Sequence, residues 1–189
     1  AYVRGTFSMR NDTLVTACEG DKYHPGDALH AVAFRCDGLV SLNFGFRSEG
    51  RVWFQNATIA KRFNVTGTLT GASEAYDWMG RSLNRNAAFM VDTAEIGTGF
   101  GFTNCKVSGG VSLSGTKVGA DVSFTGTSIS NKSKDGLGPA LIFDRSEVAG
   151  DFSFAGGKLA PASGRNFSAQ GKVSIARTKI GGDLDFTDA

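Results

Sequence analysis

Cysteine, proline and histidine are scarce in this sequence, and neither sign of charge dominates. The chain has three cysteines, three prolines and two histidines, and its 20 basic and 18 acidic residues leave a formal charge of +2. The cysteines, Cys18, Cys36 and Cys105, are odd in number and widely spaced, which favours free thiols in a reducing compartment over a disulfide framework. The balanced charge argues against a nucleic-acid partner.

The sequence also lacks the motifs of membrane-spanning proteins and of several enzyme classes. No apolar run approaches the roughly 20 residues that a membrane helix needs, so we expect no transmembrane segment. We find no G-x-S-x-G, no nucleotide-binding glycine loop and no H-E-x-x-H, and we predict no catalytic residue and no cofactor. No signal peptide is visible, and the start at Ala1 leaves both processing and truncation open.

A regular apolar pattern with a period of eleven residues runs through most of the chain. An apolar residue is followed two positions later by a second one, and five positions after that by a third. Between Phe100 and Ile129 this pattern occurs three times. Apolar residues two apart share one face of a strand, whereas a helix needs spacings of three and four.

A small residue, such as Cys105, Thr116 or Thr127, stands three positions after the second apolar residue. Each unit is therefore expected to form two short strands joined by a tight corner. Such units stack into a solenoid because one unit alone cannot bury its apolar side.

The template fits about thirteen units between Phe7 and Phe186. The second unit is placed at Val32, Phe34 and Leu39, and an irregular third unit is placed around Phe44 and Phe46. Four segments interrupt the period, after units one, five, nine and eleven: Val15–Ala31, Gly71–Ala88, Ser130–Ala140 and Ala160–Lys172. All four follow odd units, so two units per coil would place every insertion at one edge.

Charged residues follow the same parity. One outward position alternates in sign from coil to coil: Glu95, Lys117, Glu147 and Lys179. A second position repeats a carboxylate: Asp121, Asp151 and Asp183. We expect these aspartates to accept backbone N–H groups at the corner, with calcium binding as the alternative.

Local matches resemble the pentapeptide-repeat family, in which a large apolar residue recurs with a small residue two before it. The clearest are Ala57-Thr58-Ile59 and Thr178-Lys179-Ile180, although this chain has one extra residue per unit. Gly181–Phe186 also resembles bacterial β-helical proteins with GGDLxLxGA-type repeats. The resemblance implies a fold more than a function. Some pentapeptide-repeat proteins mimic DNA towards topoisomerases, but that role needs a strongly acidic face.

We therefore predict an all-β chain that forms a parallel β-helix, expected to be right-handed, with about 22 residues per coil built from two 11-residue units. Residues 1–189 should form a single domain, or a fragment of a longer array. An aromatic residue at the second apolar position should stack through the core of most coils: Phe34, Phe54, Phe102, Phe124, Phe143, Phe154 and Phe186.

Two insertions hold the candidate binding residues. The first contains both histidines, His24 and His30, with other ligand types: Cys18, Glu19, Asp21 and Asp27. No zinc-type spacing is present, so we predict no metal site and leave zinc binding by this loop as the alternative. The second insertion contains Tyr76, Trp78, Arg81 and Arg85, residue types that are enriched in binding hot spots. They could equally pack the loop onto the coil edge.

The leading functional hypothesis is a non-enzymatic scaffold that binds a protein partner, or a second copy through the open coil ends. The alternative is an enzyme or binding protein that acts on an extended polymer, such as a polysaccharide, along the loop-bearing edge. Trp53 occupies an outward slot, where a loop or a partner could cover it. A cytoplasmic or membrane-peripheral location is favoured.

Overall fold

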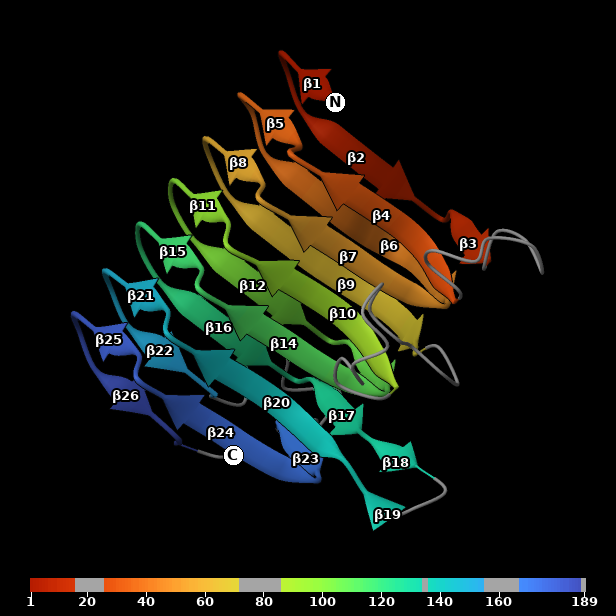
Figure 1. Cartoon of the computed structure of the whole chain (residues 1–189), viewed down its shortest axis with the longest axis vertical. Coiled ribbons are helices and arrows are strands. Elements are labelled where there is room, and N and C mark those ends of the chain that lie inside the picture. Colours follow the sequence, from red (N-terminus) through yellow and green to blue (C-terminus); the bar gives the residue numbers. More distant parts are fainter. Residues whose placement is uncertain (16–25, 72–85, 134–135, 155–166, 188–189) are drawn as a thin grey trace, which may run out of the picture.

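The computed structural model describes residues 1–15, 26–71, 86–133, 136–154 and 167–187. These residues form an all-β structure with three parallel sheets and one small antiparallel hairpin (Figure 1). No helix occurs in the described ranges, and hence none there is long and apolar enough to cross a membrane. The all-β prediction is confirmed, and the parallel sheets are compatible with a β-helix.

The three sheets differ in the length of their strands. The seven-stranded sheet has two-residue strands: β1 (Tyr2–Val3), β5 (Arg35–Cys36), β8 (Thr58–Ile59), β11 (Glu95–Ile96), β15 (Lys117–Val118), β21 (Glu147–Val148) and β25 (Lys179–Ile180). The six-stranded sheet has longer ones: β4 (Asp27–Val32), β7 (Arg51–Gln55), β10 (Ala87–Asp92), β14 (Gly110–Ser114), β20 (Pro139–Asp144) and β24 (Lys172–Ala176).

The eleven-stranded sheet has strands of mixed length: β2 (Phe7–Arg10), β3 (Thr13–Val15), β6 (Val40–Glu49), β9 (Phe63–Thr70), β12 (Phe100–Thr103), β13 (Lys106–Ser108), β16 (Val122–Thr125), β17 (Ser128–Ser130), β22 (Phe152–Ser153), β23 (Ser168–Gln170) and β26 (Leu184–Asp185). The hairpin pairs β18 (Lys132–Ser133) with β19 (Gly136–Leu137).

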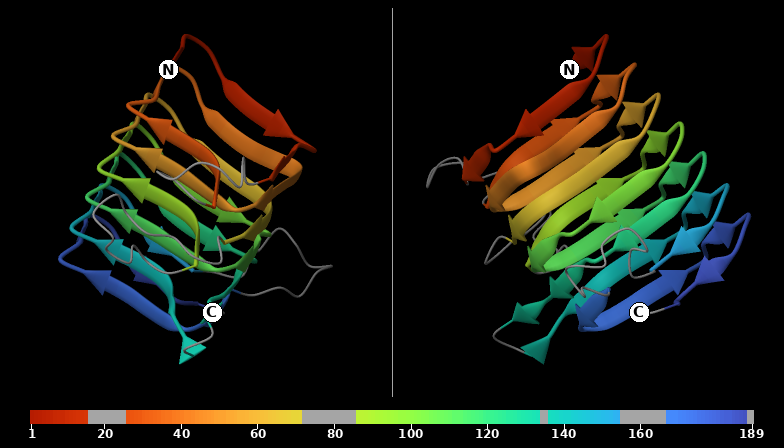
Figure 2. Two further views of the ribbon diagram at one scale, coloured as in Figure 1. Left: turned by 45° about the vertical axis from the view of Figure 1, so that its right-hand side comes forward. Right: turned by 180° about the vertical axis from the view of Figure 1, so that it is seen from behind.

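The chain visits the eleven-, six- and seven-stranded sheets in the same order again and again. We call one such passage a rung. Figures 1 and 2 show the rungs stacked in sequence order, with the N and C labels near opposite ends of the stack.

Residues one rung apart pair in register. Glu95 lies opposite Lys117, and Phe100 lies opposite Val122, which are 22 positions apart in both cases. Lys106 pairs with Ser128, again 22 positions on, and not with Lys117. The pairing step is therefore two eleven-residue units, as the parity of the insertions predicts.

The core lies between the six- and eleven-stranded sheets and is filled by phenylalanine rings. Phe124 of β16 is fully buried and contacts Phe102 one rung earlier, with ring centroids 5.5 Å apart. It also contacts Phe143 across the core, at 6.4 Å. Phe186, in the last rung, stacks on Phe154 at 4.7 Å but remains 51% exposed. The other predicted core phenylalanines are buried: Phe34, Phe54, Phe102, Phe143 and Phe154.

Small polar residues line an inner corner of the stack. The Thr116 hydroxyl donates to the Val91 carbonyl, 3.1 Å away, and the Thr127 hydroxyl donates to the Phe102 carbonyl, 3.2 Å away. Ser146 repeats the contact with Leu113 at 3.2 Å. These hydroxyls are buried, and each bonds to the preceding rung. The contact gives each buried hydroxyl a hydrogen-bond partner inside an apolar core.

A left-handed residue precedes this small residue in the described units. It is often asparagine, as at Asn56 and Asn104, which have φ of 53° and 52°. Arg145 and Arg177 occupy the same position with φ of 52° and 54°. Asparagine tolerates this region better than most residues do, so it suits the tight corner.

The prediction for the second unit is wrong by three residues. Leu29 and Ala31 pair with Val52 and Phe54, so they take the first two inward positions. Phe34, assigned to the second position, instead lies at the inner corner, where it is 5% exposed. The pattern misled because a small alanine fills the slot that other units give to a large residue.

The prediction for the third unit is also wrong. Val40 and Leu42 pair with Phe63 and Val65, and the register then shifts before Phe46. Phe44 lies in this irregular stretch, has φ of 49° and is 63% exposed. Extra residues in β6 displace the apolar spacing, as a β-bulge does.

Three of the four insertions leave from one edge, and the fourth does not. The first three lie between the eleven-stranded and six-stranded sheets, after β3, β9 and β17. The fourth lies earlier, between β22 and β23, because Ala169 rather than Leu159 pairs with Ile129. The predicted boundary Ala160–Lys172 is therefore wrong, and the insertions leave the coils at two edges.

Phe124→Ala should lower the free energy of unfolding by about 3–5 kcal/mol, because it leaves a cavity among several rings. Urea unfolding followed by circular dichroism measures this. The same change at exposed Phe44, which contacts Arg10 through its ring face, should cost at most about 1 kcal/mol. Equal losses at the two sites would contradict the assigned core.

Candidate functional site

A buried ion pair lies on the outer face of the six-stranded sheet. Asp27 and Arg51 begin β4 and β7 and lie opposite each other in register. Arg51 Nε is 2.6 Å from Asp27 Oδ1, and the two residues are 1% and 7% exposed. Removing either partner would leave a charge in a site that water barely reaches, which is costly.

Two rings lie beside this ion pair. The His30 and Trp53 rings stack with centroids 4.3 Å apart and planes 6° apart. The guanidinium of Arg51 lies 4.7 Å from the centre of the Trp53 ring, a cation–π contact. Trp53 points away from the core, yet it is only 7% exposed. The outward orientation is the one that its position in the repeat predicts, and the side chain is covered in that slot.

Trp53 links the ion pair to a third charged group. Its indole Nε1 donates to Asp92 Oδ2, 2.9 Å away on β10. Burial raises the pKa of Asp92 to about 6, against the opposing effects of the Trp53 hydrogen bond and the Arg51 charge. We call these residues the Trp53 cluster: Asp27, His30, Arg51, Trp53 and Asp92.

A pocket of about 590 Å³ adjoins Asp92 on the same face. Its lining includes Ser112, Ser114 and a second carboxylate, Asp144. Arg177 makes a two-point contact with Asp144, with distances of 3.0 and 2.8 Å. We call this pocket the aspartate pocket. It is lined by Met90, Asp92, Thr93, Ser112, Ser114, Gly115, Ile142, Asp144 and Arg145.

The aspartate pocket combines hydroxyl and carboxylate groups suited to a polar ligand. Asp92 and Asp144 lie two rungs apart, because Ser114 pairs with both. The described residues contain no cluster of three or more His, Cys, Asp or Glu side chains that could hold a metal ion.

Asp121 Oδ1 accepts the backbone N–H of Asp151 at 3.0 Å, and Asp151 accepts that of Asp183 at 2.9 Å. The structural role predicted for these aspartates is confirmed for Asp121 and Asp151.

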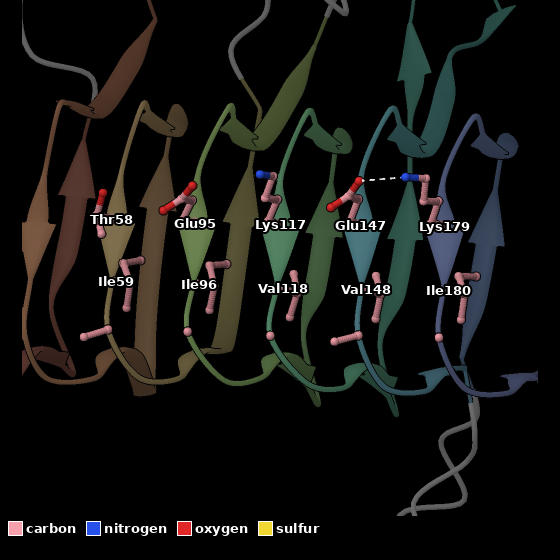
Figure 3. A pocket seen from close by; sticks show the side chains of 15 residues that line it. Thr58, Ile59, Glu95, Ile96, Lys117, Val118, Glu147, Val148, Lys179 and Ile180 are labelled. Carbon is pink, nitrogen blue, oxygen red and sulfur yellow. Dashed lines mark hydrogen bonds and ion pairs between the residues drawn. The ribbon is translucent and has the colours of Figure 1, made fainter.

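A second pocket, of about 600 Å³, lies over the seven-stranded sheet. Figure 3 shows a row of side chains that cross it from strand to strand, which we call the charge ladder: Glu95, Lys117, Glu147 and Lys179. Strand pairing confirms the predicted order, and Lys179 Nζ is 3.2 Å from Glu147 Oε1.

Only one of the six predicted binding residues falls in a described range. His30 lies on β4 in the Trp53 cluster, rather than in a loop. The other five lie outside the described residues: His24, Tyr76, Trp78, Arg81 and Arg85. The cysteines behave as expected where they are described, since Cys36 and Cys105 are free and buried. Burial raises the pKa of the Cys105 thiol to about 12. Cys18 is outside these ranges.

Sequence reasoning missed Arg51 and Asp92, which occupy outward positions where charged residues are usually solvated. It also missed the contact between His30 and Trp53. A correct register for Leu29 and Ala31 would have placed His30 opposite Trp53, one rung away. The alternation of side chains along a strand is then enough to put both rings on one face.

Comparisons of the chain with models of known protein families, with curated proteins and with solved structures find no match. Fold and geometry therefore carry the functional argument.

Asp92→Asn should change how stability depends on pH. The unfolded carboxyl loses its proton near pH 4, whereas folded Asp92 keeps it up to about pH 6. Between these values ionisation favours the unfolded chain, so the contribution of Asp92 to stability falls as pH rises through this window. The variant lacks this loss and should gain about 3 kcal/mol over the native chain between pH 4 and 7.

Urea unfolding across this pH range, with the Asp92 carboxyl carbon followed by NMR, makes the measurement. A carboxyl that titrates near pH 4 in the folded protein would contradict the assignment.

Proposed function

We propose that the protein is a non-enzymatic scaffold, a parallel β-helix of about 22 residues per coil that binds a protein partner or a second copy through its coil ends. The fold proposal draws support from the constant order of the sheets and from the pairing step of 22 residues. The relationship to pentapeptide-repeat proteins remains part of this proposal and rests on the local sequence matches.

The observation that carries the functional proposal is the exposure of the last rung. Its strands, β23 to β26, each pair on one side only among the described strands. Inward residues of this rung are exposed, including Val173 at 37% and Leu184 at 47%, whereas Phe152, the register partner of Leu184, is fully buried. Apolar side chains beside unpaired backbone groups favour the addition of another strand.

The first rung has the complementary character. Among the strands that the structure describes, β2 and β3 pair only with β6, and β1 pairs only with β5. The inward apolar residues of this rung are only partly buried: Val3, Phe7, Met9 and Leu14. A last rung joined to the first rung of another copy would continue the parallel pairing, and such a head-to-tail contact does not close on itself.

Leu184→Lys should reduce self-association, because a lysine on an edge strand opposes strand addition. Sedimentation velocity over a range of concentrations should show species larger than a monomer for the native chain and a shift towards monomer for the variant. Thr103→Lys, which adds the same charge at an exposed position in the middle of the stack, is the control. A native chain that stays monomeric at all concentrations would remove the coil-end proposal.

The aspartate pocket favours a second candidate, action on a polysaccharide. Inverting glycoside hydrolysis needs one carboxyl of raised pKa and one ionised carboxylate, roughly 6.5–9.5 Å apart. Asp92 has the raised pKa, Asp144 faces Arg177, and two rungs separate their strands by about 9.6 Å. This strand separation lies just beyond the range, so binding without cleavage is the milder form of this candidate.

Release of reducing ends from a panel of polysaccharides, and its loss in Asp92→Asn, would support the enzyme. Binding to the panel without release would support a binding protein. If the protein neither binds nor cleaves any polysaccharide of the panel, this candidate is removed and the scaffold proposal remains.

A further inference from the structure

We propose that the outer face of the seven-stranded sheet is the interface of a side-by-side homodimer, in which two copies pack through the charge ladder with opposite rung order. This contact is separate from the coil ends and does not depend on them.

The order of charges carries this inference. From one rung to the next the ladder reads Glu95, Lys117, Glu147 and Lys179, each residue paired in register with the next. Reversing an alternating series of four gives the opposite sign at every position. A two-fold axis along the strand direction reverses the rung order and keeps ladder opposite ladder. Every charge of one copy then faces an opposite charge of its partner.

The same order selects one register. With the axis midway between the rungs of Lys117 and Glu147, these two residues face each other across the interface, and Glu95 faces Lys179. Both contacts occur twice by symmetry. If the axis moves by one rung, towards Glu95, Lys179 faces Arg35, which is a repulsive pair. Copies packed with the same rung order place each charge against its equal.

The shape of the face permits close approach. Beside the ladder, the next outward position is small throughout the pocket: Ala60, Gly97, Gly119, Ala149 and Gly181. At the three glycines an added Cβ would lie 2.2–2.3 Å from a carbonyl oxygen of the preceding rung, so stacking of the rungs itself requires glycine. The row leaves room for the lysine and glutamate stems to lie between two facing sheets.

The exposure of the charge ladder and the alternation of its charges are consistent with a dimer interface. The side chains of Lys179 and Glu147 are 82% and 50% exposed, and their ion pair lies along the face rather than beneath it. The aspartate ladder at the neighbouring corner gives the contrast. Asp121, Asp151 and Asp183 have one sign, so they would repel a second copy in either order. Alternation of sign is what makes the charge ladder self-complementary.

Charge reversal tests the proposal. In the dimer Lys117→Glu places a glutamate opposite Glu147 at both symmetry-related contacts. Glu147→Lys likewise places a lysine opposite Lys117 at both contacts. Each should weaken dimerisation by about tenfold or more. The double variant Lys117→Glu/Glu147→Lys keeps the ladder complementary to its own reverse and should dimerise like the native chain. An equimolar mixture of the two single variants should form a heterodimer, although neither associates with itself.

Sedimentation velocity measures each association, and added salt should weaken the native dimer. Circular dichroism checks that every variant is folded. Recovery in the double variant and in the mixture separates an interface effect from a folding defect. Leu184→Lys should leave this dimer unchanged, which separates it from association through coil ends.

A thiol-specific crosslinker that spans about 10 Å, the spacing of two facing sheets, fixes the orientation. In a Cys18→Ser background, treating a mixture of Glu95→Cys and Lys179→Cys chains with this crosslinker should give an interchain product, and neither chain alone should. The proposal fails if the chain carrying Leu184→Lys is monomeric. It also fails if the single reversals dimerise like the native protein, or if Glu95→Cys chains crosslink to one another.

Discussion

Parallel pairing in register between successive rungs is the constraint on which the rest of the structure depends. Between Phe89 and Ser130 each paired residue lies opposite the residue 22 positions later, and elsewhere the insertions and the irregular β6 change this step. A residue type that recurs at one position of the repeat therefore recurs about every 4.8 Å along the stack. An apolar inward residue becomes a continuous column, and a buried hydroxyl such as that of Thr127 has a carbonyl of the preceding rung within reach.

The same repetition acts on the outer faces, with consequences that depend on charge. Like carboxylates one rung apart repel, and Asp121 and Asp151 offset this by accepting backbone N–H groups. Unlike charges attract, so Glu147 and Lys179 can stay on an open face. On the six-stranded sheet, Arg51 and Trp53 are buried, and they join their neighbours through an ion pair and stacked rings. Repetition thus produces three chemically distinct surfaces on one scaffold.

Much of the fold could be predicted because the apolar period is regular between Phe100 and Ile129. The prediction failed where a unit departs from the average pattern. At Ala31 a small side chain occupies a position that other units give to a large apolar residue, so the second unit was placed in the wrong register. The left-handed corner residue, four positions after the first apolar residue, would not have corrected this. It is asparagine in other units, as at Asn11, Asn56 and Asn104, but alanine in the second unit, at Ala33.

The candidate sites were less predictable because they depend on burial outside the repeat. Periodicity places Trp53 on the outer face, but it cannot show that Arg51 beside it is 1% exposed. The raised pKa of Asp92 follows from that burial and not from any motif. The charge ladder is the exception, since its order follows directly from parity and needed no knowledge of the core.

The most direct test of the account is a pair of engineered disulfides that compares a step of two units with a step of one. Glu95→Cys/Lys117→Cys should form an intrachain disulfide on mild oxidation, because paired residues on adjacent strands have Cα atoms within about 4.4–6.8 Å. Lys106→Cys/Lys117→Cys should not, since these residues lie in different sheets. Mass spectrometry of both oxidised chains, in a Cys18→Ser background, gives the answer. A disulfide in the second chain and none in the first would contradict the register on which the structure rests.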